Sequence, residues 1–471
     1  MNYFSTRDKS LEFSFKDIFL RGLAPGGGLF LPAEIKKYSQ DELNNLSQLN
    51  YNEIATEIIF NFCSGEIKKE ELSSLIQKSY SSFKDREVVN IKKIGDINLL
   101  ELYNGPTLAF KDIAMQVIGN MYDYLEVAKD KTVNVVVATS GDTGSAAIAA
   151  LSNRKNINLF VLHPHNKISN IQRKIMTTIG GSNIYNIAIE GSFDDCQKIV
   201  KELFNADSFR AKINMSGVNS INWARIVCQI VYYFYSFFKL KKNNINFSVP
   251  TGNFGDIYAG FVAKQMGLPI SRLVIATNEN DILARTLTTG DHRLESVKPT
   301  ITPSMDIQIS SNFERLLFEA AGQDSTIVRD LMAALKNNHN YSLPDKMLTF
   351  IRDSFDAGVV SEIETLEEVA LILRNTGYLT DPHTAIAVKV AREHADPDVP
   401  MVTLSTAHPA KFPDTVHDAT GKTSHPPVWG DIPAERSETV AHLMNDRACV
   451  EAHILEHFFR AQKLINSTAK D

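Results

Sequence analysis

Residues 132–151, TVNVVVATSGDTGSAAIAAL, indicate the architecture of this chain. The run TVNVVVA is rich in β-branched residues, which favour a buried strand, and the alanine-rich end favours a helix. The glycines and hydroxyl side chains between them mark a sharp strand-to-helix turn. A buried strand that leads directly into a helix is the first half of a βαβ unit, so the stretch predicts a parallel sheet covered by helices.

The same alternation of strand and helix continues along the chain, which places it in the α/β class. In such folds ligands bind at the carboxyl ends of the strands, so the loops that follow the strands are the first places to look for a site. The further predicted strands are 158–162, 184–189, 245–249 and 273–276, and the predicted helices between them are 169–179 and 193–204.

The two ends of the chain differ from this alternating region. The beginning is polar, has apolar residues at helical spacing in 51–63 and 70–83, and contains the loop GLAPGGGLFLP at 22–32, which together predict a small, mainly helical domain. The last stretch again has helical periodicity. The predicted division is an N-terminal domain at 1–95, a main region at 96–435 with a small subdomain at about 125–215 and a large subdomain in the remainder, and a C-terminal helical segment at 436–471.

Length and charge narrow the possible functions. The 471 residues carry 49 Lys+Arg and 55 Asp+Glu, which gives a formal net charge of −6. At about 150 residues per domain, the length predicts two or three domains. A mildly acidic chain argues against nucleic-acid binding as the main function, because that function needs a basic face.

The sequence predicts neither export nor membrane insertion. The N-terminal stretch MNYFSTRDKSLEF meets charge at Arg7 and has no apolar core, so no signal peptide is expected. The most apolar stretch, 221–238, contains Asn222, Arg225 and Gln229 and predicts a buried helix rather than a membrane span. The four cysteines form no CxxC pair and indicate core thiols of a reducing compartment, so we expect a cytoplasmic protein with no membrane partner.

Residues 250–256, PTGNFGD, lie between a predicted strand and the helical stretch IYAGFVAKQM. Two glycines at such a turn let backbone N–H groups converge on an anion, and the helix N-terminus adds its dipole. The loop is neither GxxxxGK[ST] nor GxGxxG, which argues against a nucleoside triphosphate and against a dinucleotide. The pattern suits a phosphate cradle, and a plain tight turn is the alternative.

A second loop of this kind, TSGDTGS at 139–145, closes the strand of the opening stretch. Its hydroxyl groups and the free N–H groups of the helix start suit a carboxylate or a phosphate, although helix capping alone gives the same pattern. Two such loops at the edge of one sheet favour a bound anionic ligand over two unrelated caps.

Residues 105–112, GPTLAFKD, place Lys111 at the start of the apolar helix IAMQVIGNMY. Burial and the positive end of the helix both favour the neutral amine, so we expect the pKa of Lys111 to be lowered. A neutral lysine amine is nucleophilic towards an aldehyde. The alternative is a surface lysine that pairs with Asp112.

Two further motifs follow later in the chain. Residues 219–225, NSINWAR, place Arg225 one turn into the apolar helix, where a guanidinium requires either a structural ion pair or a bound anion. Residues 405–412, STAHPAKF, place hydroxyl groups at a strand end, from which they can contact a ring nitrogen.

No metal site is expected from the histidines. His453 and His457 are four residues apart on a predicted helix, but they lack the HExxH glutamate and a third ligand, so a solvated face is predicted. His163 and His165 flank Pro164 and predict a solvated loop in the same way.

In their order along the chain, these motifs resemble the threonine synthase family, whose members are pyridoxal-phosphate enzymes with the tryptophan-synthase-β-like fold. The resemblance begins at an N-terminal TRD and GLAPGGGLFLP, passes through GPTLAFKD, ATSGDTGSAA, NSINWAR and PTGNFGD, and ends at STAHPAKF, so it extends to about residue 415. It implies an α/β protein with two parallel-sheet αβα domains (fold type II), preceded by the extra small N-terminal domain of the longer branch. Residues 96–435 would then be the catalytic region.

The resemblance also implies roles for individual residues. Lys111 is implied as the catalytic lysine that holds pyridoxal 5'-phosphate. In the wider fold an asparagine faces the phenolic oxygen of the cofactor where this chain has Asp142, and a carboxylate facing a phenolate is repulsive unless one of them is protonated, so the role of Asp142 stays open. The other implied cofactor contacts are Gly252, Asn253, Phe254, Gly255 and Asp256 at the phosphate and Thr406 at the pyridine nitrogen, and the implied substrate contacts are Asn219, Ser220 and Arg225 at the phosphate and Ser140 and Thr143 near the carboxylate.

The implied activity is the conversion of O-phospho-L-homoserine and water to L-threonine and phosphate, the last step of threonine biosynthesis, by γ-elimination and β-addition of water. The alternative on the same fold is a phospho-lyase that gives 2-oxobutyrate, ammonia and phosphate from the same substrate. A non-catalytic binding module is disfavoured, because it has no need to retain Lys111, the phosphate loop and Arg225 together. The implied partner is this small molecule alone, bound by a monomer or a homodimer.

Overall fold

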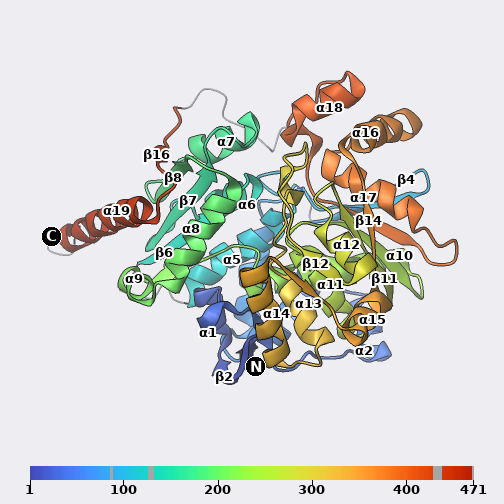
Figure 1. The fold of residues 1–471 in the computed structure, drawn as a ribbon, viewed down its shortest axis with the longest axis horizontal. Coiled ribbons are helices and arrows are strands. Elements are labelled where there is room, and N and C mark those ends of the chain that lie inside the picture. Colours follow the sequence, from blue (N-terminus) through green and yellow to red (C-terminus); the bar gives the residue numbers. More distant parts are fainter. Residues whose placement is uncertain (85–87, 126–131, 428–436, 469–471) are drawn as a thin grey trace.

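The computed structural model describes residues 1–84, 88–125, 132–427 and 437–468 (Figure 1). Two sheets dominate the chain, and each is packed against helices, as the alternation of strand and helix predicts. In Figure 1 the smaller sheet, mostly teal to green with β16 in red, stands beside the larger sheet, mostly yellow-green to orange with β4 in light blue. The chain is therefore an α/β protein with two αβα units.

The smaller sheet has five parallel strands in the order β16-β8-β7-β6-β9. Strands β6 and β7 are buried along their whole length, which is typical of parallel strands covered by helices, and it confirms the strands predicted at 132–138, 158–162 and 184–189. The strands are β6 (Val133–Ala138), β7 (Ile157–Pro164), β8 (Ile184–Ile189), β9 (Met215–Ser216) and β16 (Ala441–Leu443), and the helices of this part of the chain are α5 (Lys111–Leu125), α6 (Asp142–Leu151), α7 (Asn170–Thr178), α8 (Phe193–Asn205) and α9 (Asp207–Ile213).

The larger sheet has the order β14-β11-β10-β15-β5-β4, and its strands are parallel except for the antiparallel pair β4–β5. The strands predicted at 245–249 and 273–276 are confirmed as β10 and β11. The strands are β4 (Asn90–Ile94), β5 (Ile97–Glu101), β10 (Ile245–Pro250), β11 (Ile270–Thr277), β14 (Phe355–Val359) and β15 (Met401–Ser405), and the helices are α10 (Trp223–Leu240), α11 (Gly255–Gln265), α12 (Ile282–Thr289), α13 (Phe313–Ala320), α14 (Ser325–Asn338), α15 (Asp345–Ser354), α16 (Glu362–Thr376), α17 (Pro382–Glu393) and α18 (Pro413–Thr420).

The N-terminal region combines helices with a short sheet in the order β2-β1-β3. The helices predicted at 51–63 and 70–83 are confirmed. The short sheet was not predicted, because β1 and β3 have three residues each and the six residues of β2 are largely exposed, so none of them has a clear period. Strand β4 falls inside the predicted domain 1–95 but pairs with β5 of the larger sheet, so we propose that the N-terminal domain ends before β4. Its elements are β1 (Tyr3–Ser5), β2 (Asp8–Phe13), α1 (Phe15–Arg21), β3 (Phe30–Pro32), α2 (Gln40–Leu46), α3 (Tyr51–Cys63) and α4 (Lys69–Tyr80).

The C-terminal segment, predicted as helical over 436–471, contains a strand as well as a helix. Helix α19 (Arg447–Thr468) begins later than predicted, and β16 before it adds a parallel edge strand to β8. Residues 441–443 form a strand because they pair with the edge of β8, and no local sequence pattern predicts this strand. Residues 436 and 469–471 of the predicted segment lie outside the described residues.

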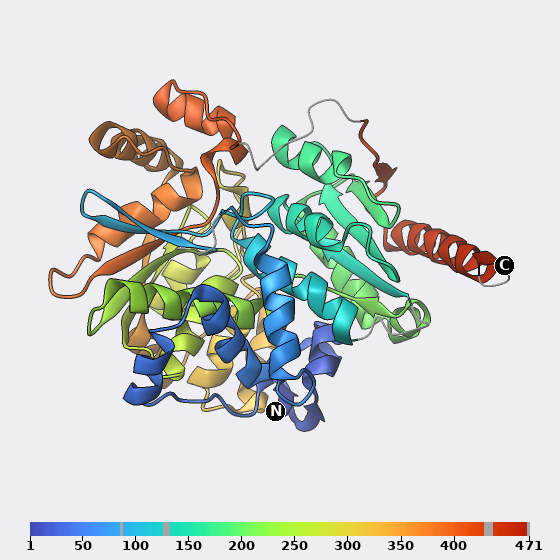
Figure 2. The ribbon, with the colours of Figure 1, turned by 180° about the vertical axis from the view of Figure 1, so that it is seen from behind.

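Helix α10 confirms the buried helix predicted from the most apolar stretch, since every residue from Trp223 to Ser236 is buried. No helix in the described ranges is long and apolar enough to cross a membrane. Instead α10 packs on α3 and α5, with ring centroids of Phe62 and Trp223 5.8 Å apart and those of Tyr51 and Tyr235 5.4 Å apart. Figure 2 shows the blue N-terminal helices beside the light-blue α5, so the N-terminal domain shares one core with the rest of the chain.

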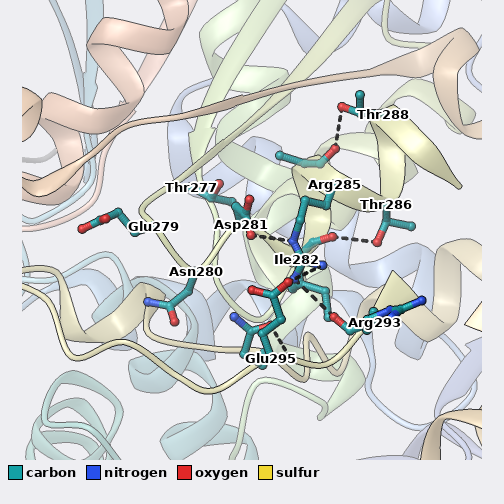
Figure 3. Close-up of polar contacts among 12 residues, drawn as sticks. Thr277, Glu279, Asn280, Asp281, Ile282, Arg285, Thr286, Thr288, Arg293 and Glu295 are labelled. Carbon is teal, nitrogen blue, oxygen red and sulfur yellow. Dashed lines mark hydrogen bonds and ion pairs between the residues drawn. The ribbon is translucent and has the colours of Figure 1, made fainter. Parts of the chain in front are cut away.

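One loop of the larger unit is fixed in place by an ionic network. Arg285 of α12 lies between two carboxylates, with Nε 2.7 Å from Asp281 Oδ1 and Nη1 3.2 Å from Glu295 Oε1 (Figure 3). Glu295 follows β12 (Asp291–Arg293), which pairs with β13 (Asn340–Ser342). The network anchors the start of a loop. Ser304 on that loop lies next to Gly252, at the carboxyl end of β10.

We predict that Asn222→Ala weakens the junction between the N-terminal domain and α10. Asn222 is fully buried, caps α10 by accepting a hydrogen bond from Ala224 N at 3.0 Å, and donates to the carbonyls of Phe19 at 3.0 Å and Gly217 at 2.9 Å. The substitution should lower the free energy of unfolding by roughly 2–3 kcal/mol, because a cap is lost and two buried carbonyls lose their donor. Urea unfolding midpoints measure the effect.

The matched control is Asn50→Ala, which removes the exposed N-cap of α3 without any buried hydrogen bond. It should cost only about 1 kcal/mol. Equal shifts of the midpoint for the two variants would contradict the bridging role of Asn222.

Candidate active site

The five motifs singled out in the sequence meet at one cavity between the two sheets. It lies at the carboxyl ends of β6, β10 and β15 and beside the N-terminus of α5. Such a position is expected for a ligand site in an α/β fold. All the residues proposed to bind cofactor or substrate line it: Lys111, Ser140, Asp142, Thr143, Asn219, Ser220, Arg225, Gly252, Asn253, Phe254, Gly255, Asp256 and Thr406.

Lys111 begins α5 and extends its amine into the cavity. Burial lowers the pKa of Lys111, and the charges of Arg225 and Lys411 add to that effect, while Asp142 opposes it. The alternative pairing with Asp112 is wrong, because that carboxylate accepts two hydrogen bonds of 2.7 Å from the backbone N–H and the hydroxyl of Thr107. Lys111 is thus a buried amine with an increased neutral fraction.

Asp142, the first residue of α6, is the ionic partner of Lys111. Its Oδ2 lies 3.0 Å from Lys111 Nζ, and its Oδ1 lies 2.7 Å from Lys411 Nζ and accepts from Gln172 Nε2 at 2.8 Å. Burial alone would raise the pKa of Asp142, but the two ammonium groups outweigh burial and hold it well below its ordinary value. The carboxylate is therefore ionised, and Lys411 balances its charge independently of Lys111.

The PTGNFGD loop leads into α11 and offers unpaired backbone N–H groups. Helix α11 has no side-chain cap, and the N–H groups of Gly255, Asp256 and Ile257 donate to no other described residue. A Cβ at Gly252 would lie 2.5 Å from the carbonyl oxygen of Ser304, so only glycine fits there. The free donors and the helix dipole form an anion cradle.

The carbonyl groups of the same loop are turned away from the cradle. Ser310 Oγ donates to the carbonyl of Gly252 at 2.7 Å, and Asn312 Nδ2 donates to that of Asn253 at 2.9 Å. The Asp256 carboxyl is likewise engaged by Tyr232 and, at 3.0 Å, by Tyr233, and burial raises its pKa to about 6. Its side chain therefore braces the loop against α10, while its backbone N–H belongs to the cradle.

The TSGDTGS loop forms a second cradle at the start of α6. Gly141 has a φ of +131°, which turns the chain so that the N–H groups of Asp142 and Thr143 donate to no described residue. Thr139 Oγ1 stabilises the turn by accepting from the N–H groups of Gly141 at 2.9 Å and Gly144 at 2.8 Å. This cradle suits a carboxylate or a phosphate, as predicted for the loop.

Arg225 lies in the cavity wall without an ionic partner. Its side chain is 2% exposed, Nη1 donates only to the carbonyl of Val218 at 3.4 Å, and no carboxylate within the described ranges comes within ion-pair distance. Burial lowers the pKa of Arg225 to about 10. Of the two alternatives drawn from the sequence, a bound anion is favoured over a structural ion pair, because an unpaired buried charge is costly. Asn219, which also lines the cavity, has no partner for its Oδ1 among the described residues.

Several residues of the cavity wall were not predicted from the sequence, and His383 is one of them. His383 lies in the first turn of α17, its Nδ1 is 3.2 Å from Asp381 Oδ1, and its buried Nε2 has no described partner. Asp381 caps α17, and this local pattern predicts a helix start rather than a site residue. The packing of α17 on β15 brings the imidazole to the cavity that Thr406 also lines, so no sequence signal was available.

A buried amine of lowered pKa and backbone anion cradles at strand ends, on a two-unit α/β fold, define the class of pyridoxal-phosphate enzymes of fold type II. Family matches agree: the description "Pyridoxal-phosphate dependent enzyme" matches residues 97–406, "Threonine synthase N terminus" matches 2–80, and "Threonine synthase, C-terminal" matches 384–454. The chain belongs to the threonine synthase family.

Relatives and solved structures support this membership. The chain is 43% identical to a threonine synthase of Pseudomonas aeruginosa over 98% of this chain and 100% of that protein, and 40% identical to that of Saccharomyces cerevisiae over 95% of each. A crystal structure of a PLP-bound threonine synthase from Brucella melitensis has a TM-score of 0.91 and 46% identity, covering 97% of this chain and 99% of that one. The yeast threonine synthase structure has a TM-score of 0.87 and 38% identity, covering 98% and 99%.

The residues of the cavity fit pyridoxal 5'-phosphate. The cofactor needs an amine for its aldehyde and donors for its phosphate. Lys111 supplies the amine, and the unpaired N–H groups of Gly255 to Ile257, beside a glycine whose place no side chain can take, supply the donors. The chain is accordingly a pyridoxal-phosphate-dependent enzyme.

We predict opposite effects of the two charged neighbours on the pKa of Lys111. Asp142→Asn removes the anion that stabilises the ammonium form, so the pKa should fall further. Lys411→Met removes a repelling cation, so the pKa should rise. Because only the neutral amine attacks an aldehyde, the pH dependence of the rate at which the apoenzyme takes up pyridoxal phosphate reports this pKa.

Lys422→Met, an exposed lysine outside the cavity, serves as the control and should leave the pH profile unchanged. Shifts of the same sign for Asp142→Asn and Lys411→Met would contradict the ionic cluster.

Proposed function

We propose that the chain converts O-phospho-L-homoserine and water to L-threonine and phosphate, the last step of threonine biosynthesis. The observation that carries the proposal is that three anion sites surround one amine. They are the α11 cradle, the α6 cradle and the unpaired Arg225. A cofactor phosphate, a substrate carboxylate and a substrate phosphate need three such sites, and this amino acid carries the last two groups.

The assignment of the anions follows from the neighbours of each site. The cofactor phosphate takes the Gly252–Asp256 cradle, with Thr406 at the ring nitrogen. The substrate carboxylate takes the α6 start, where Ser140 and Thr143 add hydroxyl groups. The substrate phosphate takes Arg225 with Asn219 and Ser220, because a guanidinium and an amide can bind several oxygens of one phosphate.

When bound, pyridoxal phosphate supplies an aldehyde that accepts amines and a ring that takes up electrons. Lys111 holds it and then acts as the general base and acid: Nζ takes a proton from the substrate carbons and returns one. One lysine can serve several transfers, because the substrate stays bound within its reach. Asp142, 3.0 Å away, orients Nζ.

Arg225 acts on the phosphate end of the substrate. The guanidinium balances the charge of the phosphate as it leaves the γ carbon, in a wall where water is largely excluded. Water then adds at the β carbon, and the products are L-threonine and phosphate. The phospho-lyase reaction would give 2-oxobutyrate and ammonia in place of threonine.

We also propose a cytoplasmic location. All four cysteines are free thiols, and Cys63, Cys196 and Cys228 are buried. Such cysteines are expected in a reducing compartment.

The proposal predicts equal amounts of phosphate and threonine from the wild-type holoenzyme and no turnover by Lys111→Ala. The variant should keep its fold, because Lys411 and Gln172 still hold the buried carboxylate of Asp142 when the amine of Lys111 is removed. It should lose the visible absorbance band that borohydride removes in the wild type. Product analysis, absorbance and circular dichroism measure these. Release of 2-oxobutyrate and ammonia by the wild type, or substantial turnover by the variant, would contradict the proposal.

Arg225→Gln should lower kcat/KM roughly 10–100-fold, since a charge-assisted contact to the substrate phosphate contributes about 1.5–3 kcal/mol. The cofactor absorbance band should persist, because its phosphate is held by backbone groups of another loop. Arg293→Gln, at an exposed arginine, is the control. Loss of the band together with activity would assign Arg225 to the cofactor phosphate instead.

A further inference from the structure

Three potential metal ligands converge at the edge of the smaller sheet, away from the active-site cavity. They are His165, which follows β7, Glu190, which follows β8, and His442 in β16. His165 Nδ1 is 2.6 Å from Glu190 Oε1, and the ring centroids of His165 and His442 are 4.7 Å apart. One ligand atom from each residue lies within 4.8 Å of the others, and none of the three lines the cavity.

The sheet register places these side chains on one face. His442 and His163 both pair with Ala188, so all three point to the same side of the sheet. His165 and Glu190 lie two residues beyond His163 and Ala188 and return to that side, because side chains alternate along a strand. Ala188, which has a small side chain, lies between the two histidine strands in this register.

Backbone hydrogen bonds hold the three segments together without any metal. His165 N donates to the carbonyl of Ile189 at 2.9 Å, and Glu190 N donates to that of Leu443 at 3.1 Å. The ligands are therefore placed by the ladder itself, and only side-chain rotations separate them from a coordinated arrangement. A site placed in this way loses little conformational entropy on binding.

A fourth imidazole lies on the same face. His163 was predicted to lie in a solvated loop, but it belongs to β7, is 2% exposed, and neither ring nitrogen has a described hydrogen-bond partner. Buried polar groups without partners are rare and need an explanation. A buried imidazole without a described partner, together with the half-buried His165 and the exposed His442, makes this face rich in nitrogen donors.

We propose that His165, Glu190 and His442 bind one zinc-class divalent ion, which fastens the C-terminal segment to the smaller sheet. Two imidazoles and a carboxylate form a donor set that zinc prefers, and exposure of Glu190 and His442 leaves room for water as a further ligand. Mg²⁺ and Ca²⁺ are disfavoured, because they require mainly oxygen ligands.

The proposed ion would strengthen the attachment of β16 to the smaller sheet. Strand β16 has three residues and, among the described strands, pairs with β8 alone at the edge of the sheet, so its ladder supplies few hydrogen bonds. An ion shared by β16, β8 and the end of β7 ties this strand to two others. Helix α19, which follows β16 and packs on α8, would be retained with it.

The test is Zn²⁺ binding to untagged holoenzyme that has been treated with a chelator. Isothermal titration should show one ion per chain, and His442→Gln and Glu190→Gln should each weaken binding at least about tenfold, because even the partners of metal ligands contribute that much. His417→Gln, at an exposed histidine on α18, should bind as the wild type does. Co²⁺ should give a visible ligand-field spectrum that His442→Gln lacks.

The fastening of β16 by the ion is tested by a separate measurement. Zn²⁺ should slow hydrogen exchange in peptides covering β16 in the wild type and not in His442→Gln. Unfolding midpoints measured in the presence of chelator check that the variants fold. We expect them to match the wild type, because the side chains of Glu190 and His442 are exposed. Unchanged Zn²⁺ affinity in both variants, or no stoichiometric Zn²⁺ binding by the wild type, would overturn the proposed site. Zn²⁺ binding without slower hydrogen exchange in β16 would overturn the proposed fastening of this strand.

Discussion

The structure depends most on the buried carboxylate of Asp142, which lies between two lysine amines. Lys111 follows β5, Asp142 follows β6 and Lys411 follows β15, so the three charges join the smaller sheet to the larger one across the cavity. Burying any one of these charges alone would be costly, and together they leave a net positive charge. The constraint fixes the relative positions of the loops that form the site and supplies a field that suits anionic ligands.

That field is local, because the chain as a whole has a formal net charge of −6. The positive potential in the cavity comes from oriented groups: the starts of α6 and α11, the unpaired Arg225 and the excess of one lysine over Asp142. Backbone donors are fixed by the fold and need no reorganisation when a charge arrives or leaves. Because Asp142 pairs with Lys411, its carboxylate does not bring an unbalanced negative charge to the cavity.

Local patterns predicted the main strands and helices around the cavity and the loops that line one side of each strand end. The strands β6, β8 and β10 and the helices α3, α8 and α10 have strong periodicity or buried apolar runs, and their positions were predicted within a few residues. Strand β16 was not, because three residues carry no period and the edge of β8 selects them. His383 was missed because its functional setting depends on the packing of α17, and the local pattern there is only a helix cap.

The sequence by itself determined which loops follow the strands, and therefore which residues reach the cavity, since parallel strands deliver their carboxyl ends to one edge. It could not decide how the charges pair, because partners are chosen by proximity in space. In the folded chain Asp112 accepts hydrogen bonds from Thr107, and Asp142 pairs with Lys111. Arg225 has no carboxylate partner among the described residues, and His442 lies against His165. The strength of an ionic interaction depends on the distance between the charges and on the local dielectric constant. Folding sets both quantities, so these pairings cannot be predicted from the sequence alone.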